Sequence, residues 1–508
     1  MRRNYFLLCL LIFLLGEKLC NAQEIFNPEY VHRIDVNFSG GDWWDSLAVH
    51  YQQFLDDDIA TYESCDVTLD GQTISNSGIR FKGQYSNFGF PGDKKPFKID
   101  FNEFVSGQNF EGLKKLNLHN FAGDPSFLRE HLSYMLLRQQ GVAASRTSYT
   151  ELYLNNQFWG LYLIVEEIDK TFIQSRFGEN GHTLYKCVSD TELGWQGWND
   201  SLYHHTIKVE FDGAQNGYTP FLNFLDLFNN QHPVDFAADF NRAFDYSAYC
   251  KILCIDVLLN NWDSYYDNGR NFSLYFDGTQ VHWIPWDYNL CMWDRSAALL
   301  PRDNSTDHYK PLLSRIAENP LLLSQYYASC CEVLNSIRVA DVINYTQTYH
   351  DLVRSYVLAD TNKFYSNADF DNNLFSTVVV NMLRNNVPTD VSLPGINELF
   401  PARLSVFKKE LFVAGYDCSD QEELHFEFSL FPNPTPDGEV YMTIWADEYA
   451  PHFDLTMTDI TGRKVEDVNC SEVEENQYHL EIPELCNGEY IITLVYNGKS
   501  YSQKLILL

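Results

Sequence analysis

The sequence predicts an α+β protein of two lobes followed by a small all-β sandwich. Residues 24 to about 168 read as short alternating strands around one strong helix. From about 169 to 415, long segments with helical apolar periodicity predominate. After Cys418 the chain returns to short alternating runs divided by turn residues, as in a β-sandwich. A chain of 508 residues also exceeds what one hydrophobic core usually covers, so several domains are expected.

The first 22 residues are typical of a secretory signal peptide. They begin with a basic pair, continue with an apolar run over residues 5–15, and end in small residues at 20–22. The apolar run is too short to span a membrane comfortably. A lipoprotein reading of Cys20 is the alternative, although Leu19 before it is large for a lipid-attachment signal. We expect the mature chain to begin at Gln23 and to be exported.

Charge and cysteine content agree with export. The formal net charge is −33, and removing the signal, with three basic residues against one acidic, leaves −35. Such a chain is not expected to bind nucleic acid through a basic surface. It is more simply an acidic exported protein that repels its neighbours. Ten of the twelve cysteines follow the signal, in a compartment where disulfides persist, but their connectivity cannot be read from the sequence.

The first lobe contains two hairpin signals and one helix. "SCDVTLDGQTISNSGIRFKGQ" alternates around Asp70-Gly71, and "KKPFKIDF" alternates again. A helix is predicted from Asp124, its N-cap, to a stop at Gly141. "TELYLNNQFWGLYLIVEEID" follows as a hairpin around Asn155-Asn156, and its second strand ends at two glutamates.

The second lobe begins its most informative stretch with a helix. "FDYSAYCKILCIDVLLNN" predicts a buried helix that leads into Asp263. "RNFSLYF" and "VHWIPWDYN" predict two short strands joined by Asp277-Gly278. Residues 339–357 and 399–412 predict amphipathic helices.

Two aspartates, each preceded by tryptophan, suggest chemistry in this stretch. Asp263 follows the helix and Asp287 follows the second strand. Protein kinases build their active site in this way, with one acid orienting the substrate hydroxyl and the other holding magnesium against the phosphates. An asparagine between the two acids would supply a further metal ligand, and Asn268 and Asn271 are both available. A structural role for both Trp-Asp pairs, as caps at strand ends, fits this stretch equally well.

A phosphate-binding lysine is available in the first lobe. A loop rich in small residues, 83–92, precedes Lys94, Lys95 and Lys98 in a predicted strand. The loop does not match G-x-G-x-x-G, and a strand lysine is more often a solvated edge residue. Glu130, in the helix that follows, is placed to pair with a lysine as in kinases, or to favour the helix dipole as a first-turn acid.

Five motifs in order resemble the CotH family, the spore-coat-protein-H kinase-like proteins, over roughly residues 26–415. They are "GIRFKGQYSNFGFPGDKKPFKIDF", "KKLNLHNFAGDPSFLREHLSYMLLRQQGV", "YTELYLNNQFWGLYLIVEEID", "LYK" at 184–186 and "NNWDSYYDNGRNFSLYFDGTQVHWIPWDYN". The resemblance implies an atypical protein-kinase-like two-lobed fold. It also implies ATP with Mg²⁺ or Mn²⁺ as cofactors, and phosphorylation of exported proteins on serine or threonine.

Carried over position by position, the resemblance assigns a role to six residues. These are Asp263 as catalytic aspartate, Asp287 and Asn271 as metal ligands, Lys98 as the phosphate lysine with Lys95 second, and Glu166 in the pocket. Two positions depart from the family pattern. Arg270 replaces the usual histidine, and Asn289 stands where many members have a second aspartate.

Two other functions stay open beside the kinase. ATP is scarce outside the outer membrane, and Asn289 removes one metal ligand. The alternatives are a non-catalytic pseudokinase that serves as a surface or matrix-assembly protein, and an enzyme on the same fold that transfers another group such as a nucleotide.

The tail carries a second resemblance. "FPNPTPDGEVYM", "TDITGRKV" and "LCNGEYIITLVYNGKSYSQKLILL" are similar to the C-terminal sorting domain of the type IX secretion system of Bacteroidetes. This implies passage through the periplasm and the type IX machinery to the cell surface or the medium. The tail is often removed, with release or attachment to surface lipopolysaccharide. A sandwich for carbohydrate binding or domain docking is the alternative. We therefore expect a signal at 1–22, lobes at 23–168 and 169–418, and a sorting domain at 424–508.

Overall fold

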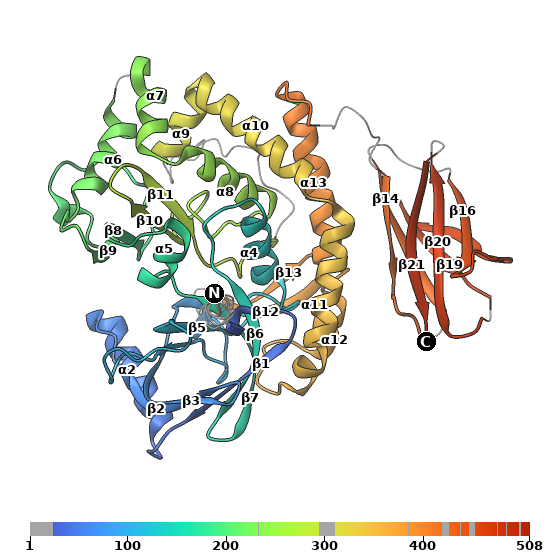
Figure 1. Ribbon diagram of the computed structural model, residues 1–508, viewed down its shortest axis with the longest axis horizontal. Helices are drawn as coiled ribbons and strands as arrows, with labels where there is room; N and C mark the ends of the chain where they lie inside the picture. Colours follow the sequence, from blue (N-terminus) through green and yellow to red (C-terminus); the bar gives the residue numbers. More distant parts are fainter. Residues whose placement is uncertain are drawn as a thin grey trace, which may run out of the picture.

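The structure is a computed structural model that describes residues 24–508 except 232, 294–309, 385–386, 419–425, 437, 447–452, 475, 484 and 497–498. The predicted signal peptide, 1–22, lies outside the described residues. Helices and strands together confirm the α+β class, and the C-terminal region is all-β (Figure 1). Within the described part of the chain, no helix is both long and apolar enough to cross a membrane.

The N-terminal part is a closed barrel of seven strands in the order β1-β2-β3-β4-β5-β7-β6. The strands are β1 (Val31–Asn37), β2 (Glu63–Leu69), β3 (Gln72–Phe81), β4 (Phe97–Asp100), β5 (Lys115–His119), β6 (Thr147–Leu154) and β7 (Gln157–Glu166). Parallel pairing of β1 with β6 closes it, and the other pairs are antiparallel. Apolar side chains such as Val36, Val67 and Ile99 fill one continuous core.

Both predicted hairpins of the barrel are present. Asp70 and Gly71 have φ of 44° and 90°, and Asn155 and Asn156 have φ of 48° and 64°. Two consecutive positive φ values are what tight hairpin loops between twisted strands require, and Asn, Asp and Gly adopt them at least cost. The turn residues therefore set the register of β2 with β3 and of β6 with β7.

Three helices accompany the barrel, and one of them approaches the second lobe. They are α2 (Trp43–Asp57), α3 (Tyr85–Phe88) and α4 (Arg129–Gln139), after a short 3₁₀ turn at Glu24–Phe26. Helix α4 begins four residues later than predicted, with Leu128 rather than Asp124 at the N-cap. Residues 124–128 form turns, with Phe127 at φ 62°, and the Asp124 carboxylate accepts hydrogen bonds from the N–H groups of Ser126 and Arg129 instead of capping a helix at its own position.

The middle of the chain is mainly helical around a four-stranded sheet in the order β11-β10-β8-β9. Its helices are α5 (Lys170–Phe177), α6 (Thr219–Asn230), α7 (Pro233–Ala243), α8 (Tyr246–Leu258), α9 (Pro311–Glu318), α10 (Pro320–Ser336), α11 (Val339–Ala359), α12 (Asn367–Asn372) and α13 (Ile396–Val413). The sheet contains β8 (Thr183–Cys187), β9 (Ile207–Asp212), β10 (Phe272–Phe276) and β11 (Val281–Pro285). The hairpin β12 (Val378–Arg384) and β13 (Val387–Leu393) was not predicted.

Helix α8 is the centre of this part. Most of its side chains are buried, including Cys250 and Cys254, and it packs against α4, α10 and β11. A disulfide joins Cys331 of α10 to Cys418, which follows α13. The bond fastens the end of the helical part to its core, and it agrees with export into an oxidising compartment.

The C-terminal region contains two four-stranded sheets around one apolar core, ordered β14-β15-β19-β18 and β17-β16-β20-β21. The strands are β14 (Phe426–Phe431), β15 (Glu439–Ala446), β16 (Asp454–Asp459), β17 (Lys464–Val465), β18 (Asn469–Glu474), β19 (Gln477–Glu481), β20 (Gly488–Tyr496) and β21 (Lys499–Leu507). It touches the helical part through Phe431, whose ring centroid is 4.0 Å from that of Phe375. The Glu427 carboxylate also accepts a hydrogen bond from the Ala340 N–H at the start of α11.

Candidate functional site

Asp263 lies in the loop that follows α8 and is held there by two asparagines. The residue is 8% exposed, and its carboxylate accepts a hydrogen bond of 3.0 Å from the Nδ2 of Asn268 and another of 3.0 Å from the Nδ2 of Asn271. Burial raises the pKa of Asp263, although these amides and the Arg270 guanidinium favour its charged form. The loop therefore presents a fixed carboxylate that is more basic than an aspartate in water.

Asp287 follows β11, and a backbone hydrogen bond links its neighbour Trp286 to the loop that carries Asp263. The Trp286 N–H donates a 2.9 Å hydrogen bond to the Asn271 carbonyl, so the residue that supports Asp263 is paired with the neighbour of Asp287. Asp287 has φ 60°, and its own N–H donates to the Tyr134 hydroxyl of α4 at 3.0 Å. Desolvation raises its pKa to about 6, and the charges of Glu130 and Asp263 add to the rise.

Asp287 belongs to a cluster of three side chains that could hold a metal ion. The other two are His119 at the end of β5 and Glu130 in the first turn of α4, and one possible ligand atom of each residue lies within 4.8 Å of the others. His119 Nδ1 is 2.8 Å from Glu130 Oε2, and His119 Nε2 is 2.8 Å from the Nζ of Lys82, which follows β3. Burial raises the pKa of Glu130 to about 8 and lowers that of Lys82 to about 7.

Lys98 lies in the same region but pairs with a different acid. Its Nζ is 2.7 Å from Glu167 Oε1, and Asn117 Nδ2 donates to Glu167 Oε2 at 2.6 Å. Although burial favours the neutral acid, Lys98, Lys186 and Lys82 together hold the pKa of Glu167 well below its usual range. Lys98 is thus a buried strand lysine rather than a solvated edge residue. Glu130 is joined to a different lysine, Lys82, through the ring of His119.

Lys95 and Glu166 make contacts of another kind. The Lys95 ammonium donates to the Asn87 carbonyl at 2.7 Å, in the loop before β4. Glu166 is buried and bonded to Arg146 at 2.5 Å and Arg176 at 2.6 Å. Successive residues of a strand point to opposite sides, so Glu167, and not Glu166, faces the Lys98 side.

A cavity lies where the barrel passes into the small sheet. It is lined by Glu167, Ile168, Leu184, Lys186, Cys187, Glu210, Asn271, Phe272, Ser273 and Trp286. Asn271 connects it to Asp263, Trp286 to Asp287, and Glu167 to Lys98. Of the six predicted site residues, Asn271 lines this cavity, and Asp263, Asp287 and Lys98 are each joined to one of its lining residues.

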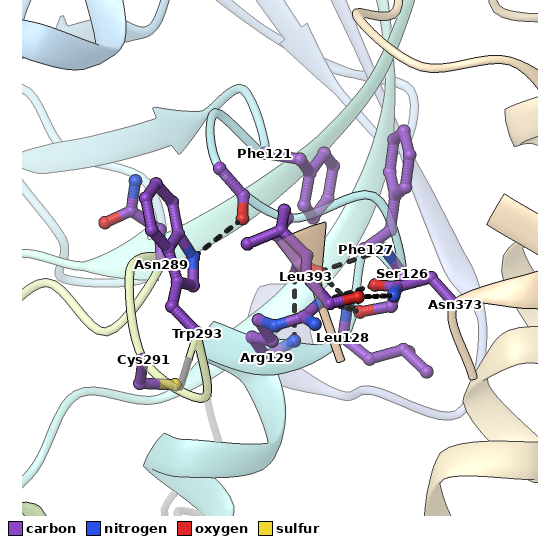
Figure 2. Close-up of polar contacts among 12 residues, drawn as sticks. Phe121, Ser126, Phe127, Leu128, Arg129, Asn289, Cys291, Trp293, Asn373 and Leu393 are labelled. Atoms are coloured by element: carbon purple, nitrogen blue, oxygen red, sulfur yellow. Dashed lines mark hydrogen bonds and ion pairs between the residues drawn. The ribbon is translucent and has the colours of Figure 1, made fainter. Parts of the chain in front are cut away.

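The loop before α4 is held from two sides (Figure 2). On one side, Asn289 Nδ2 donates to the Ala122 carbonyl at 2.8 Å, and Trp293 Nε1 donates to the Gly123 carbonyl at 3.1 Å. On the other, the buried Arg129 guanidinium donates to Asn373 Oδ1 at 2.8 Å and to the Pro394 carbonyl at 2.7 Å. These bonds fix the start of α4 and with it Glu130.

Asn289 holds the loop before α4 through a side-chain donor. An aspartate at this position would bring an acceptor against the Ala122 carbonyl, whereas the amide donates to it. We predict that Asn289→Asp lowers the free energy of unfolding by about 1–3 kcal/mol, the cost of an unmade hydrogen bond in a partly buried site. Urea unfolding would measure it, with Asn344→Asp on the exposed face of α11 as control. Equal, small losses in both variants would contradict this role.

Sequence reasoning missed Lys82, His119 and Glu167 as site residues. Lys82 directly follows the strand β3 in "RFKGQ", one strand earlier than the lysines that were considered. His119 is the polar end of the otherwise apolar strand "KLNLH". A charged or polar residue at the end of a buried strand is the signal that would have identified both.

Comparison with known proteins identifies two segments of the chain. Residues 79–385, more than half of the chain, match the model of CotH kinase proteins, and residues 429–508 match that of the secretion system C-terminal sorting domain. The chain therefore belongs to the CotH family and carries a C-terminal sorting domain. That domain implies the type IX secretion machinery and indicates export to the cell surface or secretion.

Curated relatives are distant and only partly covered. Inner spore coat protein H of Bacillus subtilis (strain 168) is 21% identical over 207 residues, which are 40% of this chain and 55% of that protein. Invasin CotH3 of Rhizopus delemar is 24% identical over 219 residues, 41% of this chain and 36% of that one. Among solved structures, the twitchin kinase region of C. elegans covers 81% of this chain and 71% of its own, at 13% identity and a TM-score of 0.19, which is too low to carry an argument about the fold.

Proposed function

We propose that this protein is an exported CotH-like kinase that transfers the γ-phosphate of ATP to serine or threonine of secreted or cell-surface proteins. In this proposal the fold is an atypical protein-kinase-like pair of lobes, 23–168 and 169–418, followed by the sorting domain at 424–508. The observation that carries it is a cavity between the barrel and the small sheet whose lining residues Asn271 and Glu167 bond to Asp263 and Lys98, and whose Trp286 precedes Asp287.

Asp263 has the properties of the residue that orients the acceptor hydroxyl. Its carboxylate is held by Asn268 and Asn271, so it cannot turn away from an incoming substrate. Its raised pKa makes it a better proton acceptor than a solvated aspartate. Phosphate transfer needs little covalent help from the protein, so a fixed carboxylate at the right place accounts for this part of the chemistry.

The acidic side chains fit a divalent cation. Asp287 offers a carboxylate, and Glu130 Oε1 has no hydrogen-bond partner among the described residues. Asn271 can offer only its amide oxygen, because its Nδ2 donates to Asp263. Mg²⁺ or Mn²⁺ held here by Asp287 with Asn271 would neutralise phosphate charge as it develops.

The lysines and the apolar wall suit the nucleotide. Lys98 and Lys82 lie on the barrel side and supply positive charge for the phosphates, with Lys186 on the sheet side. Among the residues that line the cavity, Ile168, Leu184 and Phe272 offer an apolar surface for a flat base. The Lys95 ammonium donates to the Asn87 carbonyl of α3, so we do not propose Lys95 as a phosphate-binding residue.

The location of the reaction follows from the sorting domain. The partners would be the type IX machinery during export and an exported protein as phosphoacceptor. Removal of the sorting domain would then release the kinase or attach it to surface lipopolysaccharide.

The proposal is tested by transfer of label from γ-labelled ATP with Mn²⁺ or Mg²⁺ to generic acceptor proteins. We expect Asp263→Asn in the mature chain to lower the transfer rate by about 10²–10⁴-fold, the range for loss of a general base. Asp267→Asn, an exposed residue in the same loop, is the control and should keep the wild-type rate. Equal rates for wild type and Asp263→Asn would refute the assigned role.

A further inference from the structure

We infer that His119, Glu130 and Asp287 form the protein's divalent-cation site, with an imidazole nitrogen as one ligand, so that it takes a transition metal such as Mn²⁺, Co²⁺ or Zn²⁺ in preference to Mg²⁺. The inference rests on the proposed function, because it names the ligands and the class of metal for the same site. In this ligand set His119 and Glu130 take the place of Asn271, and the sequence alone had not assigned either of them to a metal.

The first argument is the position of the ligand atoms. One atom of each of the three residues lies within 4.8 Å of the others, and His119 Nδ1 is 2.8 Å from Glu130 Oε2. Ligands bound at about 2.0–2.2 Å from one metal lie about 3 Å from each other. His119 and Glu130 are therefore already at the spacing of two ligands, and Asp287, within 4.8 Å of both, would move closer to complete the shell.

The second argument is an acceptor without a partner. Glu130 is 3% exposed, and its Oε1 has no hydrogen-bond partner among the described residues. A buried carboxylate oxygen without a donor costs free energy, and in native structures such an atom calls for an explanation. A cation between Glu130 and Asp287 would supply one and would also neutralise the repulsion between two close carboxylates.

The third argument is that the three proposed ligands come from three separate secondary-structure elements. His119 ends a barrel strand, Glu130 lies in the first turn of α4, and Asp287 follows β11. Helix α4 is fixed by Arg129 and by the loop that Asn289 and Trp293 hold (Figure 2). A cation bound here would join the barrel to the helical part. The positions of its ligands would be fixed by the packing of the elements that carry them.

The histidine decides the class of metal. Imidazole nitrogen suits Zn²⁺, Co²⁺ and other transition ions, whereas Mg²⁺ prefers oxygen ligands and keeps its water. A metal on Nδ1 would displace the proton shared with Glu130 and leave the ring proton on Nε2, which faces Lys82. The Lys82 ammonium would then leave the ring and become available to a phosphate.

Pulsed EPR of the mature chain with Mn²⁺ alone, without a polyhistidine tag or nucleotide, tests this site. We expect one tightly bound Mn²⁺ with ¹⁴N modulation from an imidazole, and we expect excess Mg²⁺ to leave it in place. Labelling wild-type histidines with ¹⁵N should replace the ¹⁴N pattern. This second measurement needs no variant and so does not depend on how a variant folds.

Variants assign the nitrogen to one residue. His119→Gln should remove the modulation and weaken Mn²⁺ binding tenfold or more, whereas His204→Gln, an exposed histidine after β8, should change neither. Bound Mn²⁺ without nitrogen modulation, modulation that persists in His119→Gln, or displacement by Mg²⁺ would each overturn the inference. The EPR samples contain no ATP and no acceptor protein, so their result does not depend on phosphate transfer. If the nitrogen signal is present but the separate transfer assay fails, only the proposed function is contradicted.

Discussion

Asp287→Asn is expected to reduce phosphate transfer by about 10³-fold or more. A metal that stabilises phosphate charge contributes several kcal/mol to the transition state, and each 1.36 kcal/mol changes the rate about tenfold. Asparagine keeps the shape of the side chain but removes the charge that both proposed ligand sets share. The measurement is the initial rate of label transfer at saturating ATP and Mn²⁺.

The same substitution should not destabilise the fold, and this separates function from folding. Desolvation and the nearby Glu130 both disfavour a charge on Asp287. Its neutral isostere removes that cost, as is common when a residue of a functional site is replaced. We expect the Tm of Asp287→Asn, measured without metal, to equal or exceed that of the wild type. Retained transfer, or loss of transfer together with a lowered Tm, would contradict the assignment.

Lys94→Met is expected to lower the free energy of unfolding by about 3–5 kcal/mol, because it leaves a buried carboxylate without its partner. Lys94 and Asp360 are both 1% exposed and form an ion pair. The Asp360 carboxylate also accepts the Leu161 N–H at 3.0 Å. The pair fastens the loop before β4 and strand β7 of the barrel to the end of α11.

Two further variants show whether the loss comes from the unpaired charge. Lys94→Met combined with Asp360→Asn should recover part of the stability, since no charge then remains buried. Arg338→Met breaks the exposed ion pair with Asp341 and should cost about 1 kcal/mol or less. Urea unfolding of the mature chain measures all three. A loss in Lys94→Met as small as that in Arg338→Met would contradict the structural role.

The sequence predicted those elements whose formation depends on residues close together in the chain, such as tight turns and periodic helices and strands. The hairpins at Asp70-Gly71 and Asn155-Asn156 require positive φ, and only a few residue types adopt it at low cost. The helix before Asp263 and the hairpin before Asp287 follow from apolar periodicity. These elements place each aspartate next to a residue that lines one cavity, Asn271 for Asp263 and Trp286 for Asp287.

Pairings between distant segments could not be predicted in the same way. Whether Lys98 meets Glu130 or Glu167 depends on how β4 lies beside β5 and β7, and Lys94 finds Asp360 266 residues away. The choice between Glu166 and Glu167 depends on the side of the strand, which one residue of register reverses. Lys82 entered the site because β3 ends there, and a strand end is the least certain feature of a sequence-based prediction.

The most direct test of the central claim is tandem mass spectrometry of the acceptor proteins and of the chain itself after incubation with ATP and Mn²⁺. The account predicts phosphate on serine or threonine with the wild type and about a hundredfold less, or lower still, with Asp263→Asn. A nucleotide adduct in place of phosphate would show that another group is transferred. Unmodified proteins, together with no rise in Tm when ATP is added, would show that the cavity serves no nucleotide chemistry and would contradict the account.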